Sequence, residues 1–382
     1  MKKKFFSMIL FFILVILLLG IIVFGYFIYE EFFGEISEPS VYTVDKIYTE
    51  DPDIDNLDIE KNRVNSTQSI GDLISENIAR EKPISQIPSN INQKQHTNFF
   101  YSQLNNNQKI IYDGLMNNKQ NLKKGNYVIN YKDVFTETLS KENGADILGD
   151  DYQSAIEAFT HDNVDVFYLD VNKMYLNIES TSKFFKTSYN VYISAAKDSN
   201  YLSNEFQSIE KIENASSLIE NEKNRILSNL KGNDYQNILY LHDFLINNIE
   251  YDSSYQQIGS YTIYGALVGK KCVCEGYAKA FKYLANCAGY ECELMQGTAT
   301  NSSGQTENHA WNCIKLSDVW YEIDVTWDDP IIIGGNGRTN NEIKYRYFLK
   351  GEKTFKQDHT LEYQFSEKGK KWAYPNININ NY

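Results

Sequence analysis

The sequence predicts an α+β protein in which a buried helix packs against an antiparallel sheet, preceded by a small α+β region and one N-terminal transmembrane helix. An apolar run over residues 5–29 predicts the transmembrane helix. Alternating aromatic and β-branched residues between 164 and 195 predict strands, and a helical pattern that begins at Cys274 is followed by a hairpin pattern. The expected parts are a membrane anchor (1–29), a disordered linker (30–97), an α+β region (98–232) and a second α+β domain (233–382).

The composition supports a globular core and argues against one class of partner. Hydrophobic residues make up 42% of the 382 residues, which is enough to bury a core. The formal net charge is −13, whereas nucleic-acid binding depends on clustered Lys and Arg. We therefore expect no nucleic acid as a partner.

The N-terminus has the pattern of an uncleaved signal anchor. Three lysines at positions 2–4 precede the apolar run, and Glu30 and Glu31 follow it, so the positive-inside rule places the N-terminus in the cytoplasm. A cleavable signal peptide is the alternative, but residues 24–29 offer no small-residue cleavage site. We therefore expect a single-pass membrane protein whose remaining chain is extracellular.

The stretch between the anchor and the second domain shows no pattern of a catalytic or metal site. Residues 30–97 are polar without a consistent period, which is typical of a disordered tether. Helical spacing of apolar residues predicts helices over 98–118 and 151–159. At the start of the second domain, a helix predicted over 234–249 carries His242 on its apolar face, where we expect a buried, hydrogen-bonded residue. We predict a structural role for the region 98–232.

A helix of about four turns is predicted from Cys274, because apolar residues recur at three or four positions until Gly289. In the first turn, unpaired backbone N–H groups and the positive end of the helix dipole favour a thiolate. The backbone N–H of Cys274 would also be free to stabilise an oxyanion. A small cysteine that packs at the start of a core helix is the alternative, which this stretch alone leaves open.

Residues 309–327 predict a β-hairpin that turns near Ser317-Asp318. In one register His309 lies opposite Thr326, with Asp324 two residues away on the same face; a turn one residue earlier places His309 opposite Asp324. Either register brings the imidazole within reach of the carboxylate. The other face is apolar, so we expect the hairpin to separate a polar face from an apolar one.

A thiol, an imidazole and a carboxylate in this order can form a nucleophilic site. A thiol needs a base, and a carboxylate on the far ring nitrogen fixes the tautomer of that base. The sequence predicts Cys274 as nucleophile, His309 as general base and Asp324 as the residue that orients it. A surface hairpin with a solvated His and Asp is the alternative, and Cys272 is the competing thiol. No loop has calcium-ligand spacing, so we expect no metal and no cofactor.

At these residues the chain resembles the transglutaminase-like superfamily, over about residues 238–349. The resemblance implies a papain-like α+β fold, with a nucleophile helix packed on an antiparallel sheet, and it assigns the three roles to Cys274, His309 and Asp324. It implies acyl transfer through a thioester at Cys274, by a transferase or a cysteine peptidase, on an envelope protein or peptide. A non-catalytic envelope scaffold or binding module is the alternative. The acceptor (amine or water), the disulfides and the oligomeric state stay open. The resemblance rests on Gly265-Ala266-Leu267, Val273-Cys274-Glu275-Gly276-Tyr277-Ala278, His309-Ala310-Trp311-Asn312 and the run from Trp320 to Pro330.

Overall fold

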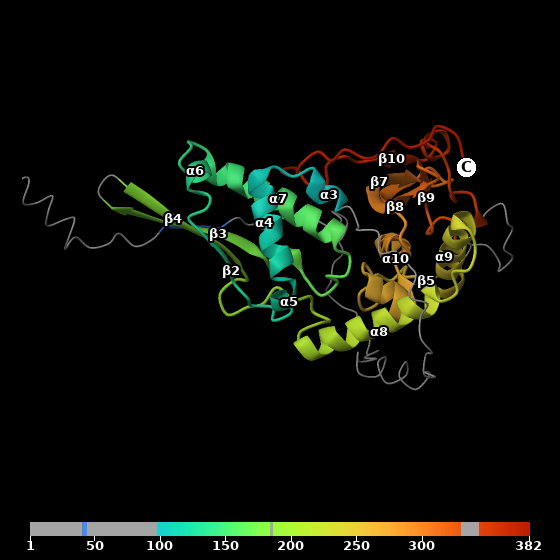
Figure 1. The fold of residues 1–382 in the computed structure, drawn as a ribbon, viewed down its shortest axis with the longest axis horizontal. Helices are drawn as coiled ribbons and strands as arrows, with labels where there is room; N and C mark the ends of the chain where they lie inside the picture. The colour runs from blue at the N-terminus through green and yellow to red at the C-terminus, as the bar shows by residue number, and fades with distance from the viewer. Residues whose placement is uncertain (1–39, 44–97, 184–185, 330–343) are drawn as a thin grey trace, which may run out of the picture.

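The computed structural model describes residues 40–43, 98–183, 186–329 and 344–382. Two halves lie side by side, and the long helix α8 (Ile209–Leu227) and the C-terminal segment each extend from one half to the other (Figure 1). The predicted membrane anchor lies outside the described residues. Within the described ranges, no helix is both long and apolar enough to cross a membrane.

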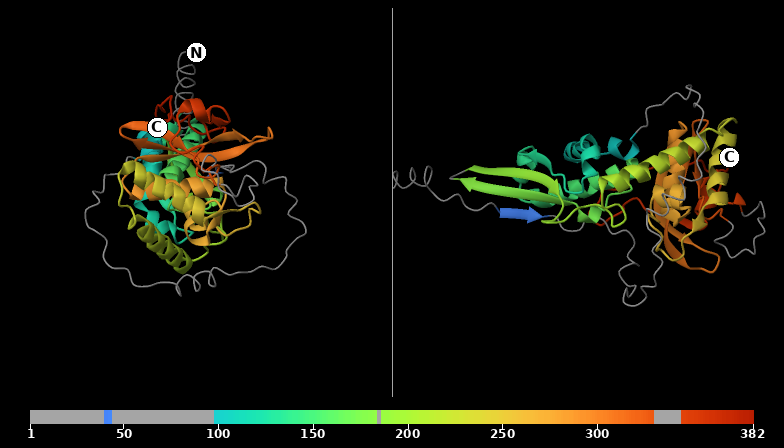
Figure 2. Two further views of the ribbon diagram at one scale, coloured as in Figure 1. Left: turned by 90° about the vertical axis from the view of Figure 1, so that its right-hand side faces the viewer. Right: turned by 90° about the horizontal axis from the view of Figure 1, so that it is seen from below.

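The first half is an antiparallel four-stranded sheet with helices on it, as the α+β prediction for this region requires. The strand order is β1-β3-β4-β2. The β3–β4 hairpin extends away from the second half of the molecule (Figure 2). The strands are β1 (Ser40–Thr43), β2 (Ile129–Lys132), β3 (Tyr175–Lys183) and β4 (Lys186–Ser194), and the helices are α3 (Phe99–Ser102), α4 (Asn106–Asn117), α5 (Lys119–Leu122), α6 (Thr136–Leu139), α7 (Gly144–Asp162) and the short η2 (Val171–Lys173).

Two local features differ from the prediction. The helix expected over 98–118 is interrupted, because Asn105 and Gln108 form a reciprocal capping box that starts α4. Strand β1 pairs with β3 although it belongs to the segment predicted to be a disordered linker, so that prediction is wrong for residues 40–43. A strand this short has no sequence period of its own, and its pairing depends on the exposed edge of β3.

The second half contains a second antiparallel sheet, of order β10-β7-β8-β9, on which helix α10 packs. Helix α10 begins at Cys274 as predicted, and Gly289, with φ of +90°, follows its end. The elements are α9 (Asp234–Asn248), β5 (Glu250–Tyr251), η3 (Gly265–Gly269), β6 (Lys271–Cys272), α10 (Cys274–Cys287), β7 (Cys292–Thr300), β8 (Thr306–Leu316), β9 (Val319–Ile323), α12 (Glu352–Phe355) and β10 (His359–Leu361).

The hairpin β8–β9 adopts the first of the two predicted registers. Leu316 pairs with Val319, and the turn residues Ser317 and Asp318 have φ of 53° and 64°, as a two-residue hairpin turn requires. Strand β9 ends at Ile323, so Asp324 follows directly after the strand.

The prediction of a polar face on this hairpin is wrong. Ala310 packs with Ala278 of α10, as expected for the apolar face. Trp311 and Cys313, which alternate with it, belong to a buried cluster with Tyr347 and other side chains. The reason is that residues 344–361, which follow the hairpin, fold back over this face. The site therefore lies inside the protein and not on an open sheet surface.

One hydrophobic core joins the two halves. It contains Phe100 and Ile156 of the first half together with Phe281 of α10 and Trp372 of the C-terminal segment. Trp372 contacts the ring of Phe100 at 5.1 Å between centroids. The boundary at 232/233 stays a prediction, and the first half packs directly on the helix that carries Cys274.

Candidate active site

Cys274 is the first residue of α10, and no side chain caps this end of the helix. The N-cap residue Val273 is extended and makes no side-chain capping bond. The first N–H groups of any helix have no helical carbonyl partner, and here no side-chain cap takes that place. The positive end of the helix dipole therefore lies at the half-buried thiol. This is the environment that stabilises an anion on sulfur or on a substrate oxygen.

The structure separates Cys274 from the other thiols of the chain. All five cysteines are free. Burial raises the pKa of Cys272 well above its ordinary value, and the neighbouring Cys274 adds to this effect. Burial also raises the pKa of Cys292 and Cys313 well above the ordinary value, and that of Cys287 to about 11. These shifts favour the thiol form at all four positions, and Cys272 is also fully buried, so both observations favour Cys274 as the nucleophile.

His309 and Asp324 are hydrogen-bonded at the end of the hairpin. His309 Nε2 lies 2.7 Å from Asp324 Oδ2, and both side chains are buried. The other oxygen, Oδ1, accepts the backbone N–H groups of Thr326 at 3.0 Å and Trp327 at 3.1 Å. Burial alone would raise the pKa of Asp324, but the charge of His309 and its hydrogen bond outweigh burial and hold this pKa well below its ordinary value. The carboxylate is therefore charged and fixed at both oxygens.

The Cys274 thiol interacts with the His309 ring and contributes to its raised pKa, so the structure brings all three predicted residues close together. Because Asp324 engages Nε2, the ring nitrogen that remains for the thiol is Nδ1. Burial lowers the pKa of His309, but the charge and hydrogen bond of Asp324, together with the hydrogen bond to Cys274, outweigh burial and raise it to about 10. A protonated imidazole next to a thiol favours the thiolate–imidazolium pair.

A second histidine contacts the same carboxylate, and the sequence did not predict it. His359 Nε2 lies 3.1 Å from Asp324 Oδ2, and its Nδ1 lies 2.8 Å from Asp358 Oδ1. His359 stands on β10, 35 positions after Asp324. No spacing or period in the sequence links these two residues, so only the folded C-terminal segment reveals the contact.

In the part of the chain that the structure describes, His309, Asp324 and His359 are the group that could hold a metal ion. Their ligand atoms all lie within 4.8 Å of one another. The separations of 2.7 and 3.1 Å from the two ring nitrogens to one oxygen are hydrogen-bond lengths, and a metal would need these protons removed. The arrangement is that of two imidazoles donating to one carboxylate.

A loop next to Cys274 is built around Asp252. This buried carboxylate accepts hydrogen bonds from Ser260 Oγ at 2.9 Å and from the backbone N–H of Gln257 at 2.9 Å. The carbonyl of Ser260 in turn accepts the backbone N–H of Val273 at 3.1 Å. A Cβ atom on Gly276 would lie 2.5 Å from that carbonyl oxygen, so only glycine lets the loop approach the helix this closely.

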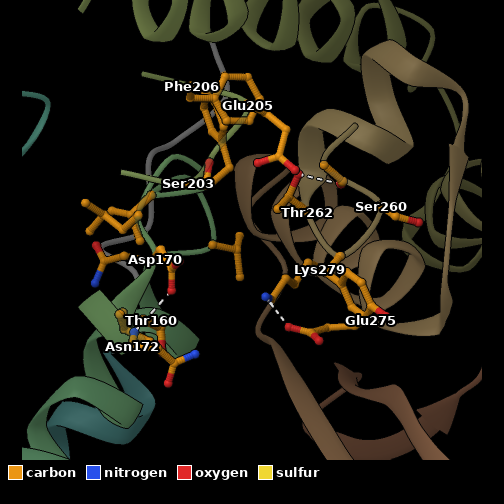
Figure 3. A pocket seen from close by; sticks show the side chains of 18 of the residues that line it. Thr160, Asp170, Asn172, Ser203, Glu205, Phe206, Ser260, Thr262, Glu275 and Lys279 are labelled. Carbon is orange, nitrogen blue, oxygen red and sulfur yellow. Dashed lines mark hydrogen bonds and ion pairs between the residues drawn. The ribbon is translucent and has the colours of Figure 1, made fainter. Parts of the chain in front are cut away.

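A cavity of about 320 Å³ lies between this loop, the first turns of α10 and the first half of the molecule (Figure 3). The ion pair of Glu275 and Lys279 forms part of one wall, immediately after Cys274 in the chain. Ser203 and Glu205 of the first half face it, with Thr262 between them (Figure 3). The region 98–232 therefore contributes directly to a cavity that is also lined by Glu275, the residue after the predicted nucleophile.

Known proteins resemble this part of the chain. Residues 223–325 match the Transglutaminase-like superfamily. The kyphoscoliosis peptidases of Mus musculus and Homo sapiens are each 26% identical over 137 residues, which is 33% of this chain and 21% of each relative. The chain thus spans about a fifth of these relatives. A solved structure, "Crystal structure of a TGase", shows 12% identity and a TM-score of 0.28 over 45% of this chain and 48% of that one. The superfamily match includes Cys274, His309 and Asp324 and ends before His359.

Proposed function

Because residues 223–325 belong to the transglutaminase-like superfamily, we propose that this protein is an acyl-transfer enzyme that forms a thioester at Cys274. The observation that carries the proposal is the hydrogen bond from His309 to Asp324, with Cys274 interacting with His309 at the uncapped start of a helix. These three groups supply the nucleophile, the base and the carboxylate that orients the base.

In the first step the thiolate of Cys274 attacks the carbonyl carbon of an amide. The carbonyl oxygen becomes an oxyanion, and the backbone N–H of Cys274 can donate to it at the helix start. His309 then donates the proton on Nδ1 to the leaving nitrogen. The C–N bond breaks, ammonia or an amine leaves, and the acyl group stays on sulfur as a thioester.

In the second step His309, now neutral, accepts a proton from the incoming group. Water gives a carboxylic acid, which is the outcome of deamidation or peptide hydrolysis, and a primary amine gives a new amide. In both cases the C–S bond breaks and the thiolate–imidazolium pair is restored. Asp324 keeps the imidazole in the same orientation throughout, because its other oxygen is held by two backbone N–H groups.

The proposal includes a location and a substrate class. We place the enzyme in the cell membrane through residues 5–29, with the catalytic part outside, which makes an envelope protein or peptide the substrate. The charge order around the apolar run supports this side of the membrane. As part of this proposal, the cavity lined by Glu205 and by Glu275, the residue after Cys274, receives a substrate segment that flanks the reacting amide. A protease added to intact cells should digest the catalytic part and leave the N-terminal tip protected.

Thiol labelling of the full chain in detergent tests the chemistry. Iodoacetamide should modify Cys274 at neutral pH much faster than a free thiol, with the modified residue mapped by mass spectrometry. Cys274→Ala should abolish the rapid phase, whereas Cys287→Ala, at the other end of the same helix, should not. Wild-type protein that lacks the rapid phase would instead favour a non-catalytic envelope module. Ammonia release from a glutamine peptide, with and without a primary amine, then identifies the acceptor.

A further inference from the structure

Two imidazoles meet one oxygen of Asp324. His309 Nε2 lies at 2.7 Å from Oδ2 and His359 Nε2 at 3.1 Å, with 5.5 Å between the two ring centroids. The second imidazole comes from β10, which lies outside the superfamily match. A change in the charge of either ring must therefore act on the other through the shared carboxylate.

The geometry around His359 requires protons on both of its ring nitrogens. Nδ1 faces Asp358 Oδ1 at 2.8 Å and Nε2 faces Asp324 Oδ2 at 3.1 Å. Ionised carboxylates only accept hydrogen bonds, and a neutral imidazole has a single N–H, so both contacts together need the imidazolium. Burial lowers the pKa of His359, but the hydrogen bonds to Asp324 and Asp358 outweigh burial and raise it. The positive charge of His309 lowers the pKa of His359. The positive charge of His359 in turn lowers the pKa of the nearby Glu322 carboxyl.

The surroundings hold this charged ring in place. Asp358 accepts the hydroxyl of Tyr347 at 2.6 Å on Oδ2, so the carboxylate that orients His359 is itself oriented. Four aromatic rings surround the imidazole with centroids at 4.7 to 5.1 Å, and they belong to Trp311, Trp327, Tyr347 and Phe355. Such packing excludes water, so that charges interact more strongly than at a surface.

We propose that His359 is a positioning residue for the acyl-transfer reaction: as an imidazolium it holds Asp324 in place and shares its negative charge with His309. The inference rests on the proposed function. Its chemical reason is that a catalytic acid works best when its pKa lies near the working pH. If His309 alone paired with Asp324, the pKa of His309 would be too high for it to donate its proton readily to the leaving nitrogen. The positive charge of His359 on the same carboxylate oxygen lowers this pKa.

The main test compares the pH dependence of Cys274 alkylation in the full chain, in detergent, between wild type and His359→Gln. Glutamine can still donate to Asp324 but carries no charge. Its loss of charge should move the high-pH change in rate, which reports the loss of the His309 proton, upward by about one pH unit. It should also lower the rate with an amide substrate at neutral pH by about tenfold. Phe355→Leu, which disturbs the same cluster without changing charge, should lower the melting temperature and leave the pH profile unmoved.

The outcomes separate the two proposals. A fast Cys274 in the wild type with an unmoved profile in His359→Gln would overturn the role of His359 alone. An unreactive Cys274 in the wild type would overturn the proposed function. If His359→Gln does not fold, ¹⁵N NMR of the five histidines in the wild type decides. A ring protonated on both nitrogens at pH 7.5 is expected for His359, and a neutral tautomer there would refute the inference.

Discussion

Lys282 allows a quantitative test of how the nucleophile helix is held. It lies on α10, buried to 2% exposure, and its Nζ donates to Glu293 Oε2 at 2.7 Å and to the backbone oxygen of His161 at 2.8 Å. The ammonium also lies 5.5 Å from the centre of the Phe100 ring. Burial lowers the pKa of Lys282, but the charge of Glu293 outweighs burial and raises it. This one side chain thus connects the helix that begins at Cys274 to the end of α7 and to α3.

Replacing Lys282 by Met should be strongly destabilising. It leaves the Glu293 carboxyl, whose pKa burial raises to about 7, without its cation, and breaking a buried ion pair in this way costs about 3–5 kcal/mol when the carboxyl is ionised, so the comparison is made at pH 8. The carbonyl of His161 also loses its donor. Since a whole domain is stable by about 5–15 kcal/mol, this change should remove a large part of the total. The measurement is urea unfolding of the full chain, followed by tryptophan fluorescence.

Two further variants test whether the loss of stability comes from the unpaired buried charge. Lys282→Met combined with Glu293→Leu removes both charges, so it should cost less than the single change, about 1–3 kcal/mol for the unpaired carbonyl. Lys315→Met, a partly exposed lysine on β8, should leave the unfolding midpoint unchanged. A loss below about 1 kcal/mol for Lys282→Met, or a double variant as unstable as the single one, would refute the reasoning.

Three other predictions follow from the same structure. Asp324→Asn removes the negative charge that raises the pKa of His309 to about 10, so the high-pH limb of the pH–rate profile should move down toward pH 6.5. In a steady-state assay kcat/KM should also fall by about 10³- to 10⁴-fold. Gly276→Ala places a Cβ 2.5 Å from the carbonyl oxygen of Ser260, so it should lower both the melting temperature and the rate of Cys274 labelling; a variant with both unchanged would contradict the close approach. Burial raises the pKa of Glu157 to about 7 from 4.5, despite its hydrogen bonds to Ser366, Gln153 and Trp372. Its ionisation therefore destabilises the folded wild type as the pH rises from 4.5 to 7. The stability of Glu157→Gln minus that of the wild type should therefore be about 3 kcal/mol larger at pH 8 than at pH 4.5. A difference that does not change with pH would contradict this prediction.

The parts of the site that the sequence predicted are those that local patterns determine. The start of α10 at Cys274 follows from helical periodicity and from the glycine that ends it, and both are confirmed. The sequence left two hairpin registers open, both of which bring Asp324 near His309, and the two-residue turn at Ser317-Asp318 selects the first of them. The three catalytic roles stay a prediction until the labelling experiment is done.

The parts that it missed depend on segments far apart in the chain. A lysine on a helix normally indicates an exposed face, so Lys282 gave no sign that it would be buried against His161, 121 positions earlier. The same holds for His359, because its partner Asp324 lies 35 positions earlier, just after strand β9, and the rings around His359 come from several separate elements. Such contacts become visible only when the packing of the two halves is known.

These distant contacts explain why the site should depend on more than the superfamily core. Residues 223–325 contain the thiol, the imidazole and the carboxylate, but the carboxylate shares its oxygen with His359 from the C-terminal segment. The helix that carries the thiol is held by Lys282 to the first half, which also forms one wall of the cavity beside it. A fragment limited to the core would therefore keep the three reacting groups and lose both the second imidazole and the support of α10. We expect such a fragment to show weak or no rapid labelling at Cys274, because the groups that fix and tune the triad lie outside it.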